Sequence, residues 1–169
     1  MYKLLMIFIL FFGLKLFAYE PILAILHSIN GNGAQSFSFK QTHFTCRPYG
    51  VDTLEKLYLT SAENSECRDE LKNFYKMNPE LKYFSYSQLK VMQMYHLEFI
   101  EDGCILYAKG QKSLSELLLR EGLAYIKPDF ENDEFGAVFK KAQESAIINK
   151  RGVWQDNIVK VCTIQTYKE

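Results

Sequence analysis

One short stretch contains the most informative residues of this chain: Cys46-Arg47-Pro48-Tyr49-Gly50-Val51-Asp52-Thr53-Leu54-Glu55. It follows an extended apolar run and contains a glycine, so we expect a strand that ends in a turn. Arginine presents a fixed fork of donors to phosphate oxygens, aspartate binds hard cations, and glutamate can act as a general base. These three side chains suit metal-assisted cleavage of a phosphodiester, although charged residues at a strand end commonly form only a solvated rim.

Upstream of this stretch, the sequence predicts three short strands. Residues 22–29 are apolar and indicate a buried strand, and residues 34–40 alternate between apolar and polar side chains. Asn30-Gly31-Asn32-Gly33 lies between them and favours a tight turn, because Asn and Gly tolerate positive φ. Residues 43–49 then form the third strand of an expected meander.

Downstream, three helices are expected. Thr60 and Glu63 form a capping box that predicts a helix ending near Asn78, before Pro79. Residues 79–88 are rich in tyrosine and indicate an irregular surface loop. The remaining signals predict a short helix capped by Ser113 and closed by Gly122, and a last helix over about 132–150.

Two further strands complete the expected fold. Residues 90–100 and 104–108 form a hairpin around Asp102-Gly103. The order of three strands, a helix, two strands and two helices is an α+β order. It fits a closed five-stranded barrel with three helices, the oligonucleotide/oligosaccharide-binding (OB) plan. With 169 residues, of which 48% are hydrophobic, the chain is expected to form one domain.

The first eighteen residues are set apart from the fold. Lys3 precedes an apolar run over residues 4–14, and Ala18 offers a small residue for cleavage, as in a secretory signal peptide. An uncleaved anchor is the alternative, but the run is short for a membrane span. We expect residues 19–169 to be an exported monomer, periplasmic or secreted, with no membrane contact after cleavage.

The exported part carries no excess of positive charge. The whole chain has 20 basic and 20 acidic residues, and removal of residues 1–18 takes away only Lys3 and Lys15. The remaining 18 basic and 20 acidic residues give a formal net charge of −2. Bulk charge therefore does not predict nucleic-acid binding, and any such contact must come from a local basic site.

Two stretches resemble the staphylococcal nuclease-like (thermonuclease) family. Residues 47–55 resemble its Arg-x-x-x-Val-Asp-Thr-Pro-Glu motif, and residues 115–124 resemble its Asn-Glu-x-Leu-Val-Arg-x-Gly-Leu-Ala motif. Ala142-Gln143-Glu144-Ser145-Ala146 and Arg151-Gly152-Val153-Trp154 follow at the expected distance. The ordered set covers nearly all of the chain after residue 18.

The resemblance implies hydrolysis of DNA or RNA phosphodiesters with a divalent metal, calcium in the first place and magnesium or manganese otherwise. Glu55 matches the glutamate that activates water, and Arg47 matches an arginine that stabilises charge on the phosphate. Asp52 matches a metal ligand. Tyr125 and Lys127 fall where the family binds a base and a terminal phosphate, although an edge tyrosine and a solvated lysine would look the same.

The chain departs from the family pattern at two places. The family's Asp-Gly-Asp-Thr turn is Asn30-Gly31-Asn32-Gly33 here, so Asn32 becomes the second expected metal ligand, with one charge fewer. The family's second phosphate-binding arginine is missing from residues 101–106, and Lys109 and Arg68 are the candidates to replace it from elsewhere in space. A catalytically impaired nucleic-acid-binding or structural OB module is therefore the alternative function, and an oligosaccharide-binding barrel is a third.

Four cysteines remain after residue 18, and their spacing does not fit a zinc site. In an exported chain they indicate two disulfides, with three possible connectivities. Cys46 ends the third strand and Cys104 begins the fifth, and these strands are neighbours in the barrel plan. That plan favours a Cys46–Cys104 bridge, which leaves Cys67 for Cys162.

Overall fold

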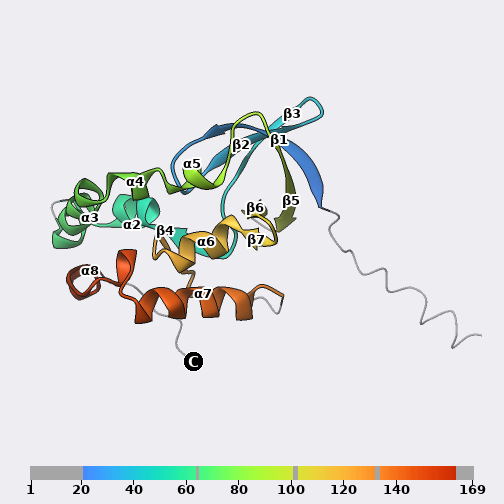
Figure 1. The fold of residues 1–169 in the computed structure, drawn as a ribbon. Helices are drawn as coiled ribbons and strands as arrows, with labels where there is room; N and C mark the ends of the chain where they lie inside the picture. Colours follow the sequence, from blue (N-terminus) through green and yellow to red (C-terminus); the bar gives the residue numbers. More distant parts are fainter. Residues whose placement is uncertain (1–20, 64, 101–102, 132–133, 163–169) are drawn as a thin grey trace, which may run out of the picture.

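The computed structural model describes residues 21–63, 65–100, 103–131 and 134–162 (Figure 1). The predicted signal peptide, residues 1–18, and Asp102 of the predicted hairpin turn lie outside the described residues. Among the helices that are described, none combines the length and apolarity needed to cross a bilayer.

A mainly antiparallel sheet forms one side of the molecule (Figure 1), with β1 near its centre, paired with both β2 and β5. The predicted meander and hairpin are both present. In spatial order β3-β2-β1-β5-β6-β7, the strands are β3 (Thr42–Cys46), β2 (Gln35–Phe39), β1 (Ile22–Ile29), β5 (Met94–Ile100), β6 (Gly103–Lys109) and β7 (Lys112–Ser113). The strand expected to be buried throughout, β1, instead alternates, because Leu23 and Ile25 point to solvent on its open face.

The two sides of this sheet meet where the chain leaves β3. The amide of Tyr49 donates to the carbonyl of Cys104 at 3.1 Å, and the amide of Cys104 donates to the carbonyl of Arg47 at 2.9 Å. These bonds form one isolated parallel bridge between Pro48 and Cys104, not a continuous ladder. Over the described residues the strands therefore form no closed barrel, and the fold shown is α+β with a mostly antiparallel sheet.

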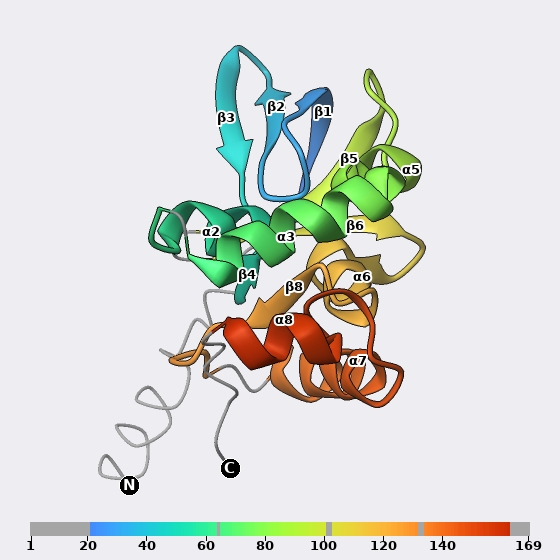
Figure 2. The same cartoon turned by 90° about the vertical axis from the view of Figure 1, so that its left-hand side faces the viewer.

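The helices are more numerous than the three expected. Residues 79–88, predicted as a loop, form two short helices, and Pro79 begins the first of them, where its missing N–H costs nothing. The described helices are α2 (Leu54–Thr60), α3 (Glu66–Met77), α4 (Pro79–Lys82), α5 (Phe84–Gln88), α6 (Leu114–Arg120), α7 (Gly136–Ile148), α8 (Asp156–Val161) and the 3-10 turn η1 (Gly152–Trp154). Figure 2 shows α7 and α8 on the side of the molecule away from β1–β3.

The predicted cap at Thr60 is wrong. Its hydroxyl donates to the carbonyl of Lys56 at 3.0 Å and so lies at the end of α2, not at the start of a helix. Ser65 caps α3 instead, accepting the amide of Arg68 at 3.3 Å. The prediction for Ser113 is confirmed, since its hydroxyl accepts the amide of Glu116 at 3.1 Å.

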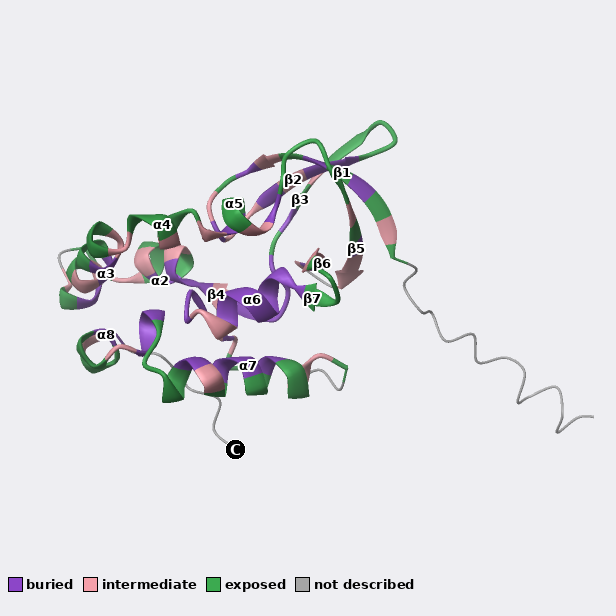
Figure 3. Cartoon of the chain, viewed as in Figure 1, coloured by how far each residue is buried: buried purple, intermediate pink, exposed green. Residues whose placement is uncertain are grey.

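The core is centred on α6, which is buried at six consecutive positions, 114–119, and lies between the sheet and α7 (Figure 3). Behind it, Gly122 and Gly152 are packed against each other with positive φ, and the amide of Val153 donates to the carbonyl of Gly122 at 2.8 Å. A Cβ on Gly122 would overlap the carbonyl of Arg151, and a Cβ on Gly152 would overlap the carbonyl of Gly122. Trp154 follows directly and is buried.

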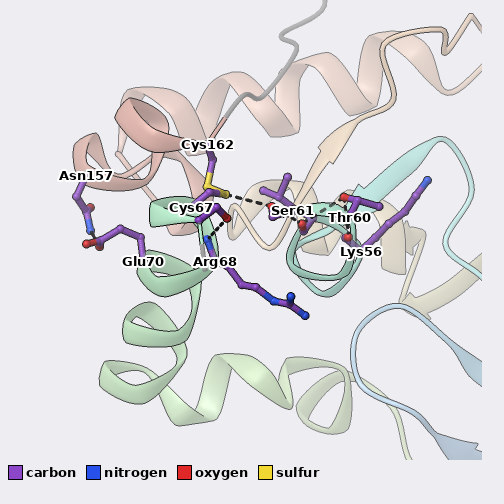
Figure 4. Close-up of a disulfide and its surroundings, with 10 residues drawn as sticks. Lys56, Thr60, Ser61, Cys67, Arg68, Glu70, Asn157 and Cys162 are labelled. Carbon is purple, nitrogen blue, oxygen red and sulfur yellow. Dashed lines mark hydrogen bonds between the residues drawn. A yellow bond between two sulfur atoms is a disulfide. The ribbon is translucent and has the colours of Figure 1, made fainter. Parts of the chain in front are cut away.

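Two disulfides tie these layers together, and both are the pairs that the barrel plan favours. Cys46 and Cys104 join β3 to β6, with Cα atoms 5.6 Å apart. Cys67 and Cys162 join α3 to the residue that follows α8, with Cα atoms 4.7 Å apart (Figure 4). Such bridges indicate a non-reducing environment.

Candidate active site

The Val51-Asp52-Thr53 segment folds in a way that brings two carboxylates, on different elements, to one cleft. It forms β4 (Val51–Thr53), which pairs antiparallel with β8 (Ala124–Ile126). The hydroxyl of Thr53 then accepts the amide of Lys56 at 3.4 Å and caps α2. Asp52 consequently lies on a strand, and Glu55 lies in the first turn of a helix, where negative charge is favoured.

Four of the six predicted site residues line one cleft of about 440 Å³: Arg47, Asp52, Glu55 and Lys127. Lys56 lines it as well, and we call it the Arg47 cleft. Arg47 comes from the chain after β3 and Lys127 from the chain after β8, so segments far apart in sequence meet here. Three cations and two acids give the cleft a local excess of positive charge, although the chain as a whole has none.

Glu55 has the environment of a proton acceptor. Its Oε1 accepts the amide of Asn32 at 3.2 Å, while Oε2 is buried and has no hydrogen-bond partner among the described residues. Burial raises the pKa of this carboxyl, and the hydrogen bonds that it accepts oppose the shift without cancelling it. A raised pKa makes the ionised form a stronger base.

Asp52 is held by a neighbouring lysine. Its Oδ1 lies 2.7 Å from Nζ of Lys56, and the aspartate side chain is only 15% exposed. Lys56 was not among the residues predicted from the sequence. The signal was its position four residues after Asp52, but that spacing brings two side chains together only if the chain turns into a helix at Leu54.

The metal-ligand role predicted for Asn32 is not supported. Its side chain is fully buried and points away from the Arg47 cleft, where its Oδ1 accepts both the amide and the hydroxyl of Ser85 at 3.0 and 3.1 Å. Its Nδ2 donates to the carbonyl of Leu81 at 2.9 Å. Asn32 therefore ties the turn to α4 and α5, and reaches the site only through its backbone amide.

The donor set for a metal is incomplete. Within the described part of the chain, no three His, Cys, Asp or Glu side chains are grouped closely enough to hold an ion. Asp52 and Glu55 are the acidic side chains that line the Arg47 cleft, and Asp52 already binds Lys56. Calcium takes six to eight oxygens, so these two carboxylates do not by themselves form its site.

Tyr125 and Lys127 lie on the β8 side, in different relations to the cleft. Tyr125 is half-buried and pairs across the ladder with Asp52, and burial together with that nearby aspartate raises the pKa of its hydroxyl. It does not line the cleft. Lys127 does, and its amide donates to the carbonyl of Gly50 at 3.1 Å.

The two residues considered as substitutes for the missing arginine do not reach this site. The guanidinium of Arg68 lies over the ring of Tyr58, 4.4 Å from its centroid, and Lys109 ends β6. Neither lines the Arg47 cleft, in which Lys56 and Lys127 are the further cations. The chain matches no known protein-family model and no curated protein.

Proposed function

We propose that this protein hydrolyses phosphodiester bonds of DNA or RNA, with Glu55 as the general base and Arg47 as the phosphate clamp. One observation carries the proposal. Arg47, Glu55 and Lys127 come from three separate segments of the chain and line a single cleft with an excess of positive charge. A phosphate with two free oxygens suits such a set of donors, and the buried carboxyl can accept a proton from water.

The strand order supports an OB-type plan as the scaffold. β1 pairs with β2 and β5, β5 pairs with β6, and the end of β3 meets β6 in parallel. A partly open barrel of five strands with such pairings is a common platform for oligonucleotides, and here β7 extends the sheet beyond β6. The resemblance of residues 47–55 and 115–124 to the thermonuclease family points to the same class of substrate.

The side chains suggest a simple sequence of events. A water oxygen forms a bond to phosphorus while its proton passes to Glu55. The ester P–O bond breaks with its electron pair on the leaving oxygen, which takes a proton from solvent. Arg47 donates to the phosphate oxygens as charge builds on them, and Lys127 adds positive charge nearby. Asp52 is the residue that would hold a divalent cation, most simply calcium, with Glu55 beside it.

The test of this function is cleavage of circular plasmid and single-stranded RNA by the oxidised protein, in calcium, magnesium or chelator. We expect cleavage that falls by about 10²–10⁴-fold in Glu55→Gln, the usual contribution of a general base. Glu144→Gln is the matched control, because Glu144 is exposed on α7 and outside the cleft. A folded, oxidised protein that cleaves neither substrate under any of these conditions overturns the proposal.

A binding or structural module without catalysis is the second candidate. The ion pair between Asp52 and Lys56 favours it, because that contact leaves the cleft basic but without a complete set of metal ligands. This candidate predicts salt-sensitive nucleic-acid binding with no cleavage. The plasmid and RNA assay therefore separates the two.

A further inference from the structure

A second cleft, of about 530 Å³, lies on the other side of α2. We call it the α3 cleft. Its lining comes from three successive helices: Glu55, Tyr58 and Leu59 of α2, Leu71, Lys72, Tyr75 and Lys76 of α3, and Lys82 of α4. Glu55 and Leu59 also line the Arg47 cleft, so α2 is the ridge between the two. Leu59 is 74% exposed on that ridge.

One face of α3 supplies a basic stripe along this cleft. Arg68, Lys72 and Lys76 follow one another at intervals of four residues, which places them on the same side of a helix. Lys82 of α4 adds a fourth cation. Lys76 and Lys82 have no ion-pair partner in the described part of the chain, and Lys72 meets only the exposed Asp69 at 3.2 Å. Such an exposed pair is weak and easily displaced.

Glu70, one of the acidic residues of α3, is directed away from this cleft. Figure 4 shows Glu70 pointing toward Asn157 of α8, whose Nδ2 donates to it at 2.6 Å. In the same view Arg68 extends from α3 toward α2. The guanidinium of Arg68 covers one face of the Tyr58 ring, so charge and aromatic surface occur together.

Buried polar atoms without a partner occur in the lining of the α3 cleft and beside it. The Tyr75 hydroxyl, Oε2 of Glu55 and Nε of Arg68 are all buried without a hydrogen-bond partner among the described residues. Buried polar atoms normally have partners. Glu55 and Tyr75 line the α3 cleft, and Arg68 lies on the same basic stripe of α3, so these atoms point to a polar ligand. Burial and the nearby Glu55 raise the pKa of Tyr75, so its hydroxyl remains a donor at neutral pH.

We propose that the α3 cleft is a second nucleic-acid subsite, which holds a neighbouring nucleotide of the single strand bound in the Arg47 cleft. The lysines meet its phosphates, and the apolar surface of Leu59, Leu71 and the tyrosine rings receives a base. Positively charged grooves with aromatic side chains are how proteins track single strands without reading sequence. The inference rests on the proposed nucleic-acid binding of the Arg47 cleft, but not on cleavage there.

The test of this subsite is the binding of labelled dT2 and dT10 to the oxidised protein. Binding is measured by fluorescence anisotropy in chelator over a salt series. The variant is Lys76→Gln/Lys82→Gln. The matched control is Lys109→Gln/Lys112→Gln, which removes the same charge from exposed positions on the β6–β7 hairpin. We expect the variant to bind dT10 about tenfold or more weakly, and its salt slope to fall by about 1.4, at roughly 0.7 per phosphate contact.

The outcomes separate the two proposals. Binding of dT2, which reaches only one cleft, should not change in the variant. Equal losses in variant and control, no loss in either, or no binding of dT10 by the unmodified protein overturns the subsite. If poly-glutamate displaces labelled dT10 as effectively as unlabelled dT10 does, the subsite is also overturned. That result would point to an acidic protein partner. Binding through the α3 cleft without any cleavage leaves the subsite standing and overturns only the hydrolase.

The aromatic contribution has its own test. Tyr58→Leu keeps an apolar side chain but removes the ring, and the loss of one stacked base corresponds to about 5- to 150-fold in affinity for dT10. An unchanged thermal midpoint shows that the fold is intact. Unchanged dT10 affinity in a folded Tyr58→Leu protein rules out stacking on this ring.

Discussion

The two clefts beside α2 are built in opposite ways. The Arg47 cleft is assembled from chain segments that backbone bonds and the Cys46–Cys104 disulfide hold in place, and it mixes acids and bases at short range. The α3 cleft takes four of its lining residues from one face of α3, and its cations are long, exposed lysines. The first arrangement fixes the orientations of the side chains, as proton transfer and bidentate contacts require. The second supplies only charge and surface, which are sufficient for affinity.

The largest effect that separates the clefts is expected at Arg47. Arg47→Lys retains the charge but loses the planar fork, so we expect kcat/KM for plasmid cleavage to fall about 10²–10³-fold. Lys76→Gln should instead raise KM and leave kcat nearly unchanged. A similar fall in kcat for both variants would show that the two clefts do not differ in this way.

The disulfides should differ in how they affect the clefts. Removing either bridge is expected to cost about 2–5 kcal/mol of unfolding free energy, measured by urea denaturation. Only Cys46→Ser/Cys104→Ser should also weaken dT2 binding, because Cys46 immediately precedes Arg47. Cys67→Ser/Cys162→Ser is the matched control, and an equal loss of dT2 binding there would contradict the comparison.

The pH dependence should report on Glu55, which both clefts share. Because burial raises its pKa above the unfolded value of about 4.5, the folded protein binds more protons than the unfolded chain just above that pH. The contribution of this group to stability is therefore greatest at low pH and declines as pH rises through the raised pKa. Activity should follow the opposite course, since the base must be ionised.

The measurement is a comparison with Glu55→Gln. We expect this variant to be more stable than the unmodified protein at neutral pH, and the difference to shrink as pH falls toward 4.5. The Glu144→Gln control should show no such trend. A variant that is less stable at neutral pH would mean that hydrogen bonds to the ionised carboxylate outweigh its burial.

The smallest effect is expected at Lys56. Its pair with Asp52 is more than half exposed on the lysine side, so Lys56→Met should change the unfolding free energy by less than about 1 kcal/mol. Release of Asp52 should nevertheless tighten calcium binding, measured by calorimetry. Lys140→Met provides a control on α7, and unchanged calcium binding in Lys56→Met would exclude Asp52 as a cation ligand.

Local signals in the sequence predicted the five longer strands, and the barrel plan built from them favoured the observed cysteine pairs. Alternation in residues 34–40 and the turn at Asn30 depend only on neighbouring residues, and the sheet order then brings Cys46 beside Cys104. The second helix start was predicted from Ser113 for the same reason. The helix start predicted at Thr60 was wrong because Thr60 and Glu63 match a capping box in sequence, while Thr53 had already begun a helix.

The sequence predicted which residues form most of the site, but not all of the contacts that they make. Arg47, Asp52, Glu55 and Lys127 reach one cleft because the short ladder of β4 and β8 joins their segments. The role of Asn32 could not be read from sequence, since it depends on Ser85, which lies more than fifty residues away in a region expected to be irregular. Long-range burial of this kind leaves no periodic trace.

The two disulfide loops overlap along the chain. One spans residues 46–104 and the other 67–162, so every peptide bond between Cys46 and Cys162 lies inside at least one of them. A single cut by a protease anywhere in that interval would leave the fragments covalently joined. On a gel, nicked molecules would migrate as separate pieces only after reduction. Outside a reducing compartment, the molecule is thus built to survive its first proteolytic cut in one piece.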